Sequence, residues 1–149
     1  MKLKRNAGFT IIEIAVVVSV IAIIASIILV SFGQVQKDSR DRSRTADIMS
    51  LKHALDHYYR DNNEYPAVCS GDNSGCNVSL LAAQLVPAYI PSIPTDPKIA
   101  TPYQYIRGVP GAINSYGILI TYEAQATCKA GVNVSSGWWG AGVPTCEDG

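Results

Sequence analysis

Residues 2–13 read KLKRNAGFTIIE and join a short basic segment to a long apolar run. From Phe9 to Phe32 there are 24 residues, and Glu13 carries the only ionisable side chain among them. A helix of this length reaches about 36 Å, which is enough to cross a hydrocarbon core of about 30 Å. The cations before the run, at residues 2, 4 and 5, favour a topology with the N-terminus inside and the C-terminus outside.

Ordinary targeting signals explain this segment less well. A secretory signal has an apolar core of about 7–15 residues before a small-residue cleavage site, and this run is longer, although Ala22, Ala25 and Ser26 are small. A lipoprotein signal needs a cysteine at the end of the run, and the first cysteine is Cys69. A plain membrane anchor gives no reason for a carboxylate inside the apolar segment.

Gly8, Phe9, Thr10, Ile12 and Glu13 form a pattern that resembles the type III signal of type IV prepilins and related pseudopilins. The resemblance implies that a membrane peptidase cleaves between Gly8 and Phe9 on the cytoplasmic face and methylates the new amine of Phe9. Glycine at the cut suits a protease that must approach the backbone closely. The prepilin peptidase and methyltransferase is therefore an expected partner.

Glu13 needs a specific reason to lie in an apolar helix. A charge in mid-membrane costs about 2.5–3.5 kcal/mol, and burial among packed helices requires a partner. The ammonium of Phe9, on the same or a neighbouring subunit, would be such a partner, so we expect Glu13 to set the register of assembly. The alternative is that Glu13 simply reaches the headgroups.

Composition favours an exported structural protein. The formal net charge is zero, but removal of the three leader cations leaves nine basic residues against twelve acidic ones. A mature charge of −3 argues against a nucleic-acid partner. The sequence contains no nucleophile elbow, zinc-protease motif or phosphate-binding loop, so we expect no enzyme activity and assign no catalytic residue, metal or other cofactor. The resemblance implies that a separate cytoplasmic ATPase, with an inner-membrane platform, supplies the energy of assembly.

The pattern after the apolar run predicts one nearly continuous helix from about Thr10 to Asn62. Its second half is amphipathic, with apolar side chains at helical spacing that need a partner surface: Ile48, Leu51, Leu55, and Tyr58 or Tyr59. Gly33 is either a bend or a tolerated glycine. The cluster of Lys37, Arg40, Arg42 and Arg44 is interpreted as a solvated helix face with local salt bridges; contact with lipid headgroups or with the acids of neighbouring subunits is the alternative.

Beyond this helix, the sequence predicts a short helix at Ser79–Leu85 and strands at Tyr103–Arg107 and Tyr116–Glu123. The fold class is α+β: a long N-terminal helix, with a transmembrane and an amphipathic half, packs on a small antiparallel sheet, as in pilins. We expect a leader at 1–8, a membrane and assembly helix at 9–33, and a periplasmic or extracellular head at 34–149.

Four cysteines lie beyond the apolar run, where the predicted topology places them in an oxidising compartment. They permit three pairings. Sequential pairing, Cys69 with Cys76 and Cys128 with Cys146, closes two local rings, and a ring of about 15 residues contributes about 3 kcal/mol. The second ring resembles the disulfide-bounded region of type IV pilins. The spacing is not that of a zinc site, and a helical His53 and His57 fit a solvated rim better than a metal site.

Two further features leave alternatives open. Major pseudopilins use a loop near the C-terminus for calcium, and carboxylates that could serve here are Asp72, Asp96, Glu123, Glu147 and Asp148. No loop of the EF-hand type is present, and the cysteine ring occupies that region. Trp138 and Trp139 either form a binding surface for a partner or glycan, or pack inward to pin their own loop.

We therefore expect the chain to be a subunit of a type IV pilus-like filament, polymerised with itself and other pilins through its apolar helix. Before assembly it would wait in the inner membrane among lipids. The alternative is a pseudopilin of a type II secretion system, favoured by Tyr65-Pro66 and Asp96-Pro97. A second alternative, from another class, is a membrane-tethered extracellular binding protein that presents Trp138 and Trp139.

Overall fold

The computed structural model describes residues 8–69, 75–98, 102–108 and 113–146. The chain divides into two compact units, Met1–Lys37 and Asp38–Gly149. The second unit is called the head below. The expected leader at 1–8 lies outside the described residues except for Gly8.

Helix α1 spans Ile11–Asn62 and confirms the long helix predicted from sequence. It ends at Asn62, three residues before Tyr65 and Pro66. Asn63 adopts a positive φ of 57°, and its backbone N–H donates to the carbonyl of Tyr59 at 2.8 Å. Asparagine tolerates this left-handed conformation better than most residues, which makes it a suitable helix stop.

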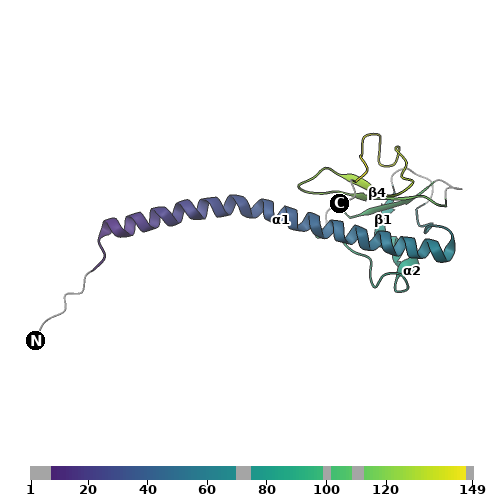
Figure 1. The fold of residues 1–149 in the computed structure, drawn as a ribbon, viewed down its shortest axis with the longest axis horizontal. Helices are drawn as coiled ribbons and strands as arrows, with labels where there is room; N and C mark the ends of the chain where they lie inside the picture. Colours follow the sequence, from purple (N-terminus) through teal and green to yellow (C-terminus); the bar gives the residue numbers. More distant parts are fainter. Residues whose placement is uncertain (1–7, 70–74, 99–101, 109–112, 147–149) are drawn as a thin grey trace, which may run out of the picture. The chain divides into compact units, whose positions relative to one another are not determined.

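Four strands form one antiparallel sheet in the described part of the head, in the order β1-β2-β3-β4. Their bounds are β1 Cys76–Asn77, β2 Gln104–Arg107, β3 Tyr116–Ile120 and β4 Cys128–Val132. In Figure 1 the sheet lies along the C-terminal half of α1. The α+β fold predicted from sequence is therefore confirmed.

Three elements differ in detail from the sequence prediction. The strand expected at Tyr116–Glu123 ends at Ile120, because the chain then turns to bring Glu123 to α1. The short helix begins as a 3-10 turn at Val78–Leu81 and continues as α2 at Ala82–Leu85. Its N-cap is Asn77, whose side-chain oxygen accepts from the N–H of Ser79 at 2.8 Å, so the helix begins at Val78, one residue before the predicted start at Ser79.

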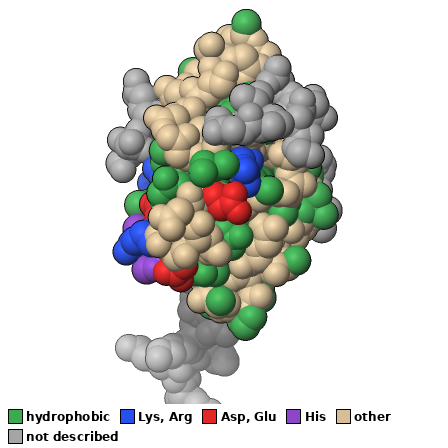
Figure 2. Space-filling model, turned by 90° about the vertical axis from the view of Figure 1, so that its right-hand side faces the viewer, with side chains coloured by type: hydrophobic (Ala, Val, Ile, Leu, Met, Phe, Trp, Pro, Cys, Tyr) green, Lys and Arg blue, Asp and Glu red, His purple; other side chains and the backbone are tan. Residues whose placement is uncertain are grey.

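The core of the head forms where the apolar stripe of α1 meets the sheet. Ile48, Leu51 and Leu55 are at most 4% exposed, which confirms the stripe. Each such side chain contributes about 1.5–3 kcal/mol by its burial. Tyrosines from the strands and from the segment after α1 complete the core, with the rings of Tyr65 and Tyr116 4.4 Å apart. On the face shown in Figure 2, hydrophobic side chains are scattered among polar and charged ones.

The outer face of β3 is covered by the two tryptophans. Trp138 is only 4% exposed, and its ring lies so close to Gly117 that a Cβ there would be 2.9 Å from a ring carbon. Trp139 also reaches Gly117 and Gly75. The tryptophans therefore pack inward, and β3 is buried on both faces.

Candidate assembly site

The N-terminal end of α1 carries the residues assigned to processing and assembly. Gly8 and Phe9 precede the helix, and Phe9 is 85% exposed. The backbone N–H and the hydroxyl of Thr10 both donate to the Glu13 carboxylate at 2.7 Å, and the Glu13 N–H donates back to the Thr10 hydroxyl at 3.3 Å. This reciprocal arrangement is a capping box, which satisfies helix-terminal N–H groups that otherwise lack partners.

The capping box gives Glu13 a partner within its own subunit that the sequence analysis missed. The Thr-x-x-Glu spacing was visible in the sequence and is the signal for this motif. Cleavage after Gly8 would create an ammonium on Phe9, one residue from the amide that Glu13 already holds. In the described structure Glu13 caps the first turn of α1.

The first unit presents an almost wholly apolar helix surface. The large hydrophobic side chains that the structure describes as exposed between Ile11 and Val35 are Ile11, Ile12, Ile14, Val16, Val17, Val18, Val20, Ile21, Ile23, Ile24, Ile27, Ile28, Phe32 and Val35. This part of α1 is long and apolar enough to cross a membrane by length and composition, with a mean hydropathy of 3.0 over its best window. The hydroxyls of Ser19 and Ser26 donate to carbonyls three residues earlier, which satisfies them in an apolar environment.

Gly33 does not interrupt α1. A Cβ at this position would meet no atom within 4 Å, so no close contact in the described structure requires a glycine.

Charged residues of α1 near the start of the head form ion pairs with residues of two loops that are distant in the sequence. We call this group the Arg44 cluster; its members are Arg40, Asp41, Arg44, Asp96, Lys98 and Glu123. The guanidinium of Arg44 donates to both carboxylate oxygens of Asp96 at 2.7 and 2.9 Å. It also donates to Asp41 at 2.6 Å and to Glu123 at 3.1 Å.

Arg40 and the backbone complete the cluster. Arg40 donates to both oxygens of Glu123 at 2.7 and 2.9 Å. The backbone N–H groups of Glu123 and Ala124 donate to the Asp41 carboxylate. One helix turn of α1 is thereby joined to the segment that follows β3, in bidentate geometry that is stronger than single neutral hydrogen bonds.

These contacts shift the pKa values of Glu123, Asp41 and Arg44 in the direction that favours their charged forms. The hydrogen bonds from Arg40 lower the pKa of Glu123 to about 2, with a further contribution from Arg44. Burial alone would raise the pKa of Asp41, but the backbone donors of Glu123 and Ala124 and the guanidinium of Arg44 outweigh it, so that pKa is lowered. The hydrogen bonds to Asp96 raise the pKa of Arg44. Glu123, Asp41 and Arg44 are therefore charged at neutral pH.

The interpretation of the four basic residues as a solvated helix face with local salt bridges is wrong for Arg44, although its pair with Asp41 is such a local salt bridge. Arg44 has 0% of its side chain exposed and Arg40 has 31% exposed, whereas Lys37 and Arg42 are exposed. The physical reason is the helical period: Arg44 lies four residues before Ile48, on the stripe that faces the core. A cation on that stripe is buried, so it needs carboxylate partners.

Two disulfides close local rings in the head, Cys69 with Cys76 and Cys128 with Cys146. Inside the second ring, Lys129 is only 3% exposed, and its ammonium donates to the carbonyls of Ser135, Ser136 and Trp138 at 2.9–3.4 Å. Sequence reasoning missed Lys129, since nothing in its neighbourhood marks it as buried. It holds the loop that carries the tryptophans.

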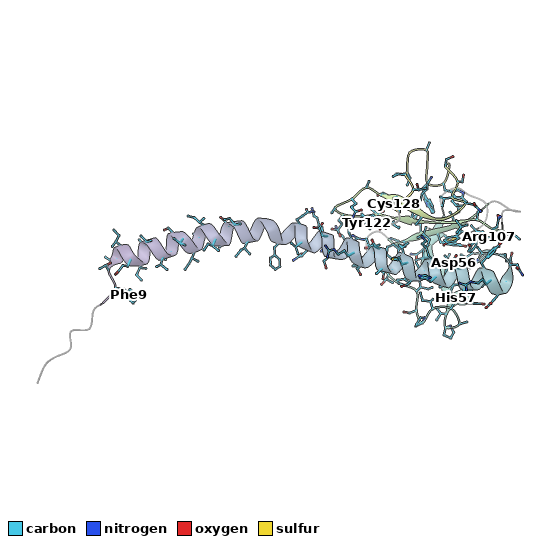
Figure 3. The ribbon with its side chains drawn as sticks, viewed as in Figure 1. Phe9, Asp56, His57, Arg107, Tyr122 and Cys128 are labelled. Carbon is cyan, nitrogen blue, oxygen red and sulfur yellow. A yellow bond between two sulfur atoms is a disulfide. The ribbon has the colours of Figure 1, made fainter. Side chains whose placement is uncertain are left out.

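The described residues offer no group of three or more histidine, cysteine or acidic side chains placed to hold a metal ion. His53 and His57 are exposed on α1, and Figure 3 shows His57 on the side of α1 away from the sheet. Of the carboxylates considered for calcium, Asp96 and Glu123 belong to the Arg44 cluster. Asp72, Glu147 and Asp148 lie outside the described residues.

Two family models and several relatives match most of the chain, and they agree on the kind of protein. Residues 3–29 match the family model for the prokaryotic N-terminal methylation motif, and residues 31–128 match the model for type II secretion system (T2SS), protein G. The core protein G of the type II secretion system of Aeromonas hydrophila is 29% identical over 93% of this chain and 96% of the relative. That of Vibrio cholerae is 31% identical over 77% of this chain and 81% of the relative. No solved structure matches.

These findings confirm the resemblance to the pilin and pseudopilin family, and they favour the secretion pseudopilin, our alternative, over the pilus subunit that we expected first. Relatives of this kind are structural subunits, and the chain is not an enzyme. With a protein G match over residues 31–128 and the methylation motif before it, this chain belongs to the type II secretion system protein G family.

Proposed function

We propose that this chain is a structural pseudopilin that is inserted as a precursor, cleaved after Gly8, methylated at Phe9 and polymerised through the apolar part of α1. The main support is that one chain combines a protein G match with a methylation motif, and that this motif leads directly into an exposed apolar helix. Such a surface is costly in water, and it is stable either among lipid tails or against the same surface of other subunits.

We propose the domain organisation in the same terms. Residues 1–8 are the leader, 9–33 are the membrane and assembly helix, and 34–149 are the head with the amphipathic half of α1. The precursor is anchored in the inner membrane with its N-terminus in the cytoplasm, and the assembled subunit lies in a filament outside that membrane. Basic residues before the apolar run and two disulfides after it support this orientation.

Its proposed partners follow from the same pathway. The prepilin peptidase and methyltransferase acts on Gly8 and Phe9, further copies and other pseudopilins bind along the apolar helix, and a membrane platform with a cytoplasmic ATPase drives extraction from lipid. Glu13 is proposed to set the register of each added subunit by neutralising the Phe9 ammonium. Its bond to Thr10 supports a placement of the carboxylate at the first turn of α1.

The two other candidate functions are less well supported. A pilus subunit shares the helix and the processing motif, but the head matches protein G. A tethered binding protein needs exposed anchors, and Trp138 is buried against Gly117.

A deletion of the gene in its source organism separates these functions. For a secretion pseudopilin we expect substrates of the secretion system to accumulate inside the cell, with no loss of long surface filaments in electron micrographs of sheared fractions. Expression of the wild-type chain should restore export, while a Gly8→Asp variant, which blocks cleavage, should not. Normal export in the deletion strain, with missing surface filaments, would instead identify a pilus subunit.

A further inference from the structure

The three carboxylates of the Arg44 cluster have no oxygen left without a donor. Each oxygen of Asp41 accepts at least one backbone N–H from residues 123–124, and one of them also accepts from Arg44. The oxygens of Asp96 accept from Arg44 and from the N–H of Lys98. Those of Glu123 accept from Arg40, Arg44 and the ammonium of Lys98.

The charges of the cluster also balance. Arg40, Arg44 and Lys98 contribute three positive charges, and the three carboxylates contribute three negative ones. Arg44 lies at the centre, and its side chain is 0% exposed. A cluster without net charge gives no electrostatic attraction for a further cation, and at its buried centre of Arg44, Asp41 and Asp96 an added charge would be unpaired in a region of low dielectric constant.

A divalent metal ion at this cluster would need the same oxygens. Calcium takes 6–8 oxygen ligands at 2.3–2.6 Å, and carboxylates are its main protein ligands. At this cluster a calcium ion could reach both oxygens of Asp96 only by displacing the guanidinium of Arg44 from its bidentate bond. It would have to compete with Arg40, Arg44 and Lys98 for the oxygens of Glu123. The residues that are present do not fit a metal ion there; they fit an arginine.

We propose that Arg44 is the structural cation of the head: it joins α1 to the loops at Asp96 and Glu123 and thereby makes the fold of the head independent of divalent metal ions. The inference goes beyond the proposed function, because it concerns what holds the head together and not what the filament does. A subunit of this kind keeps the same head in calcium-poor and calcium-rich surroundings.

Thermal unfolding of the full chain in detergent micelles tests the proposal, with the tyrosine signal in near-ultraviolet circular dichroism as the readout of the head. We expect the unfolding midpoint of the wild type to be the same in excess calcium chloride and in excess EGTA. Arg44→Gln should lower the midpoint by on the order of 10 °C, because it leaves buried carboxylates unpaired. Arg42→Gln, which removes an exposed arginine two residues away, should change it by less than about 2 °C.

A wild-type midpoint that rises by more than about 5 °C in calcium would overturn the proposal, since a ligand that binds the folded state raises its stability. An Arg44→Gln chain as stable as the Arg42→Gln chain would also overturn it. If Arg44→Gln does not fold, the calcium comparison on the wild type still decides the question. The measurement does not involve secretion, so its outcome is separate from that of the deletion experiment.

Discussion

The contact between Trp138 and Gly117 predicts that the stability effects of changing the two residues are coupled, because the Trp138 ring occupies the space that a side chain at position 117 would need. The Trp138 ring lies over the backbone of β3, where a Cβ on Gly117 would be 2.9 Å and 3.0 Å from two of its carbons. Such distances are shorter than normal carbon contacts, so Gly117→Ala must displace the ring. We expect this overpacking to cost about 1–3 kcal/mol of unfolding free energy.

The matching truncation is larger in effect. Trp138 is 4% exposed, and Trp138→Ala removes a buried aromatic ring and leaves the outer face of β3 covered only by Trp139. A loss of about 3–5 kcal/mol is typical of such a change. In the double variant the alanine at 117 no longer meets the Trp138 ring, and it partly fills the space. The double variant should therefore be more stable than the sum of the two single losses predicts, with a coupling of about 1–3 kcal/mol.

Urea unfolding of the full chain in mild detergent, followed by circular dichroism, measures the four free energies of this cycle. Gly137→Ala is the control, since a Cβ there would have its nearest neighbour, the Ser135 hydroxyl, at 3.9 Å. We expect it to change stability by less than about 0.5 kcal/mol. If the losses of unfolding free energy at positions 117 and 138 are additive, Trp138 does not pack on β3. The tryptophans would then be interpreted as exposed binding residues.

Three further predictions test other parts of the molecule. The pKa of Glu123 is lowered from an ordinary value of 4.5 to about 2 in the folded head, so its contribution to stability is complete above pH 4.5 and is lost as the pH falls towards 2; thermal midpoints between pH 7 and pH 2 should show this fall, and Arg40→Gln should reduce it. Gly131→Ala should cost about 2 kcal/mol or more in urea unfolding, because Gly131 has a φ of 152° and a Cβ would overlap the carbonyl oxygen of Tyr116. Glu13→Ala should be exported and cleaved normally, as shown by N-terminal sequencing, but should yield less assembled filament; Glu13→Gln keeps an acceptor for the capping box without the charge, so normal assembly of that variant would assign Glu13 to capping alone.

The sequence was sufficient for the parts of the fold that rest on periodicity. The apolar run and the stripe from Ile48 to Tyr59 predicted α1 to within a residue at either end, because a long helix repeats its signal many times. Strand β4 at Cys128–Val132 was missed, since a lysine and a glycine interrupt any alternation. The two-residue β1 is too short to give a pattern and is defined only by its pairing with β2.

The Arg44 cluster shows why the site was harder to predict than the fold. Its ion pairs join residues that are 52 and 79 positions apart, and no local pattern indicates such pairing. The position of Arg44 was nevertheless informative, because it continues the core stripe one turn before Ile48, whereas Arg42 is out of phase with that stripe and is exposed. A cation in phase with a buried stripe is unstable unless carboxylates come to it. The phase of Arg44 therefore predicts that acidic residues from distant loops must fold onto α1, even though it cannot say which ones.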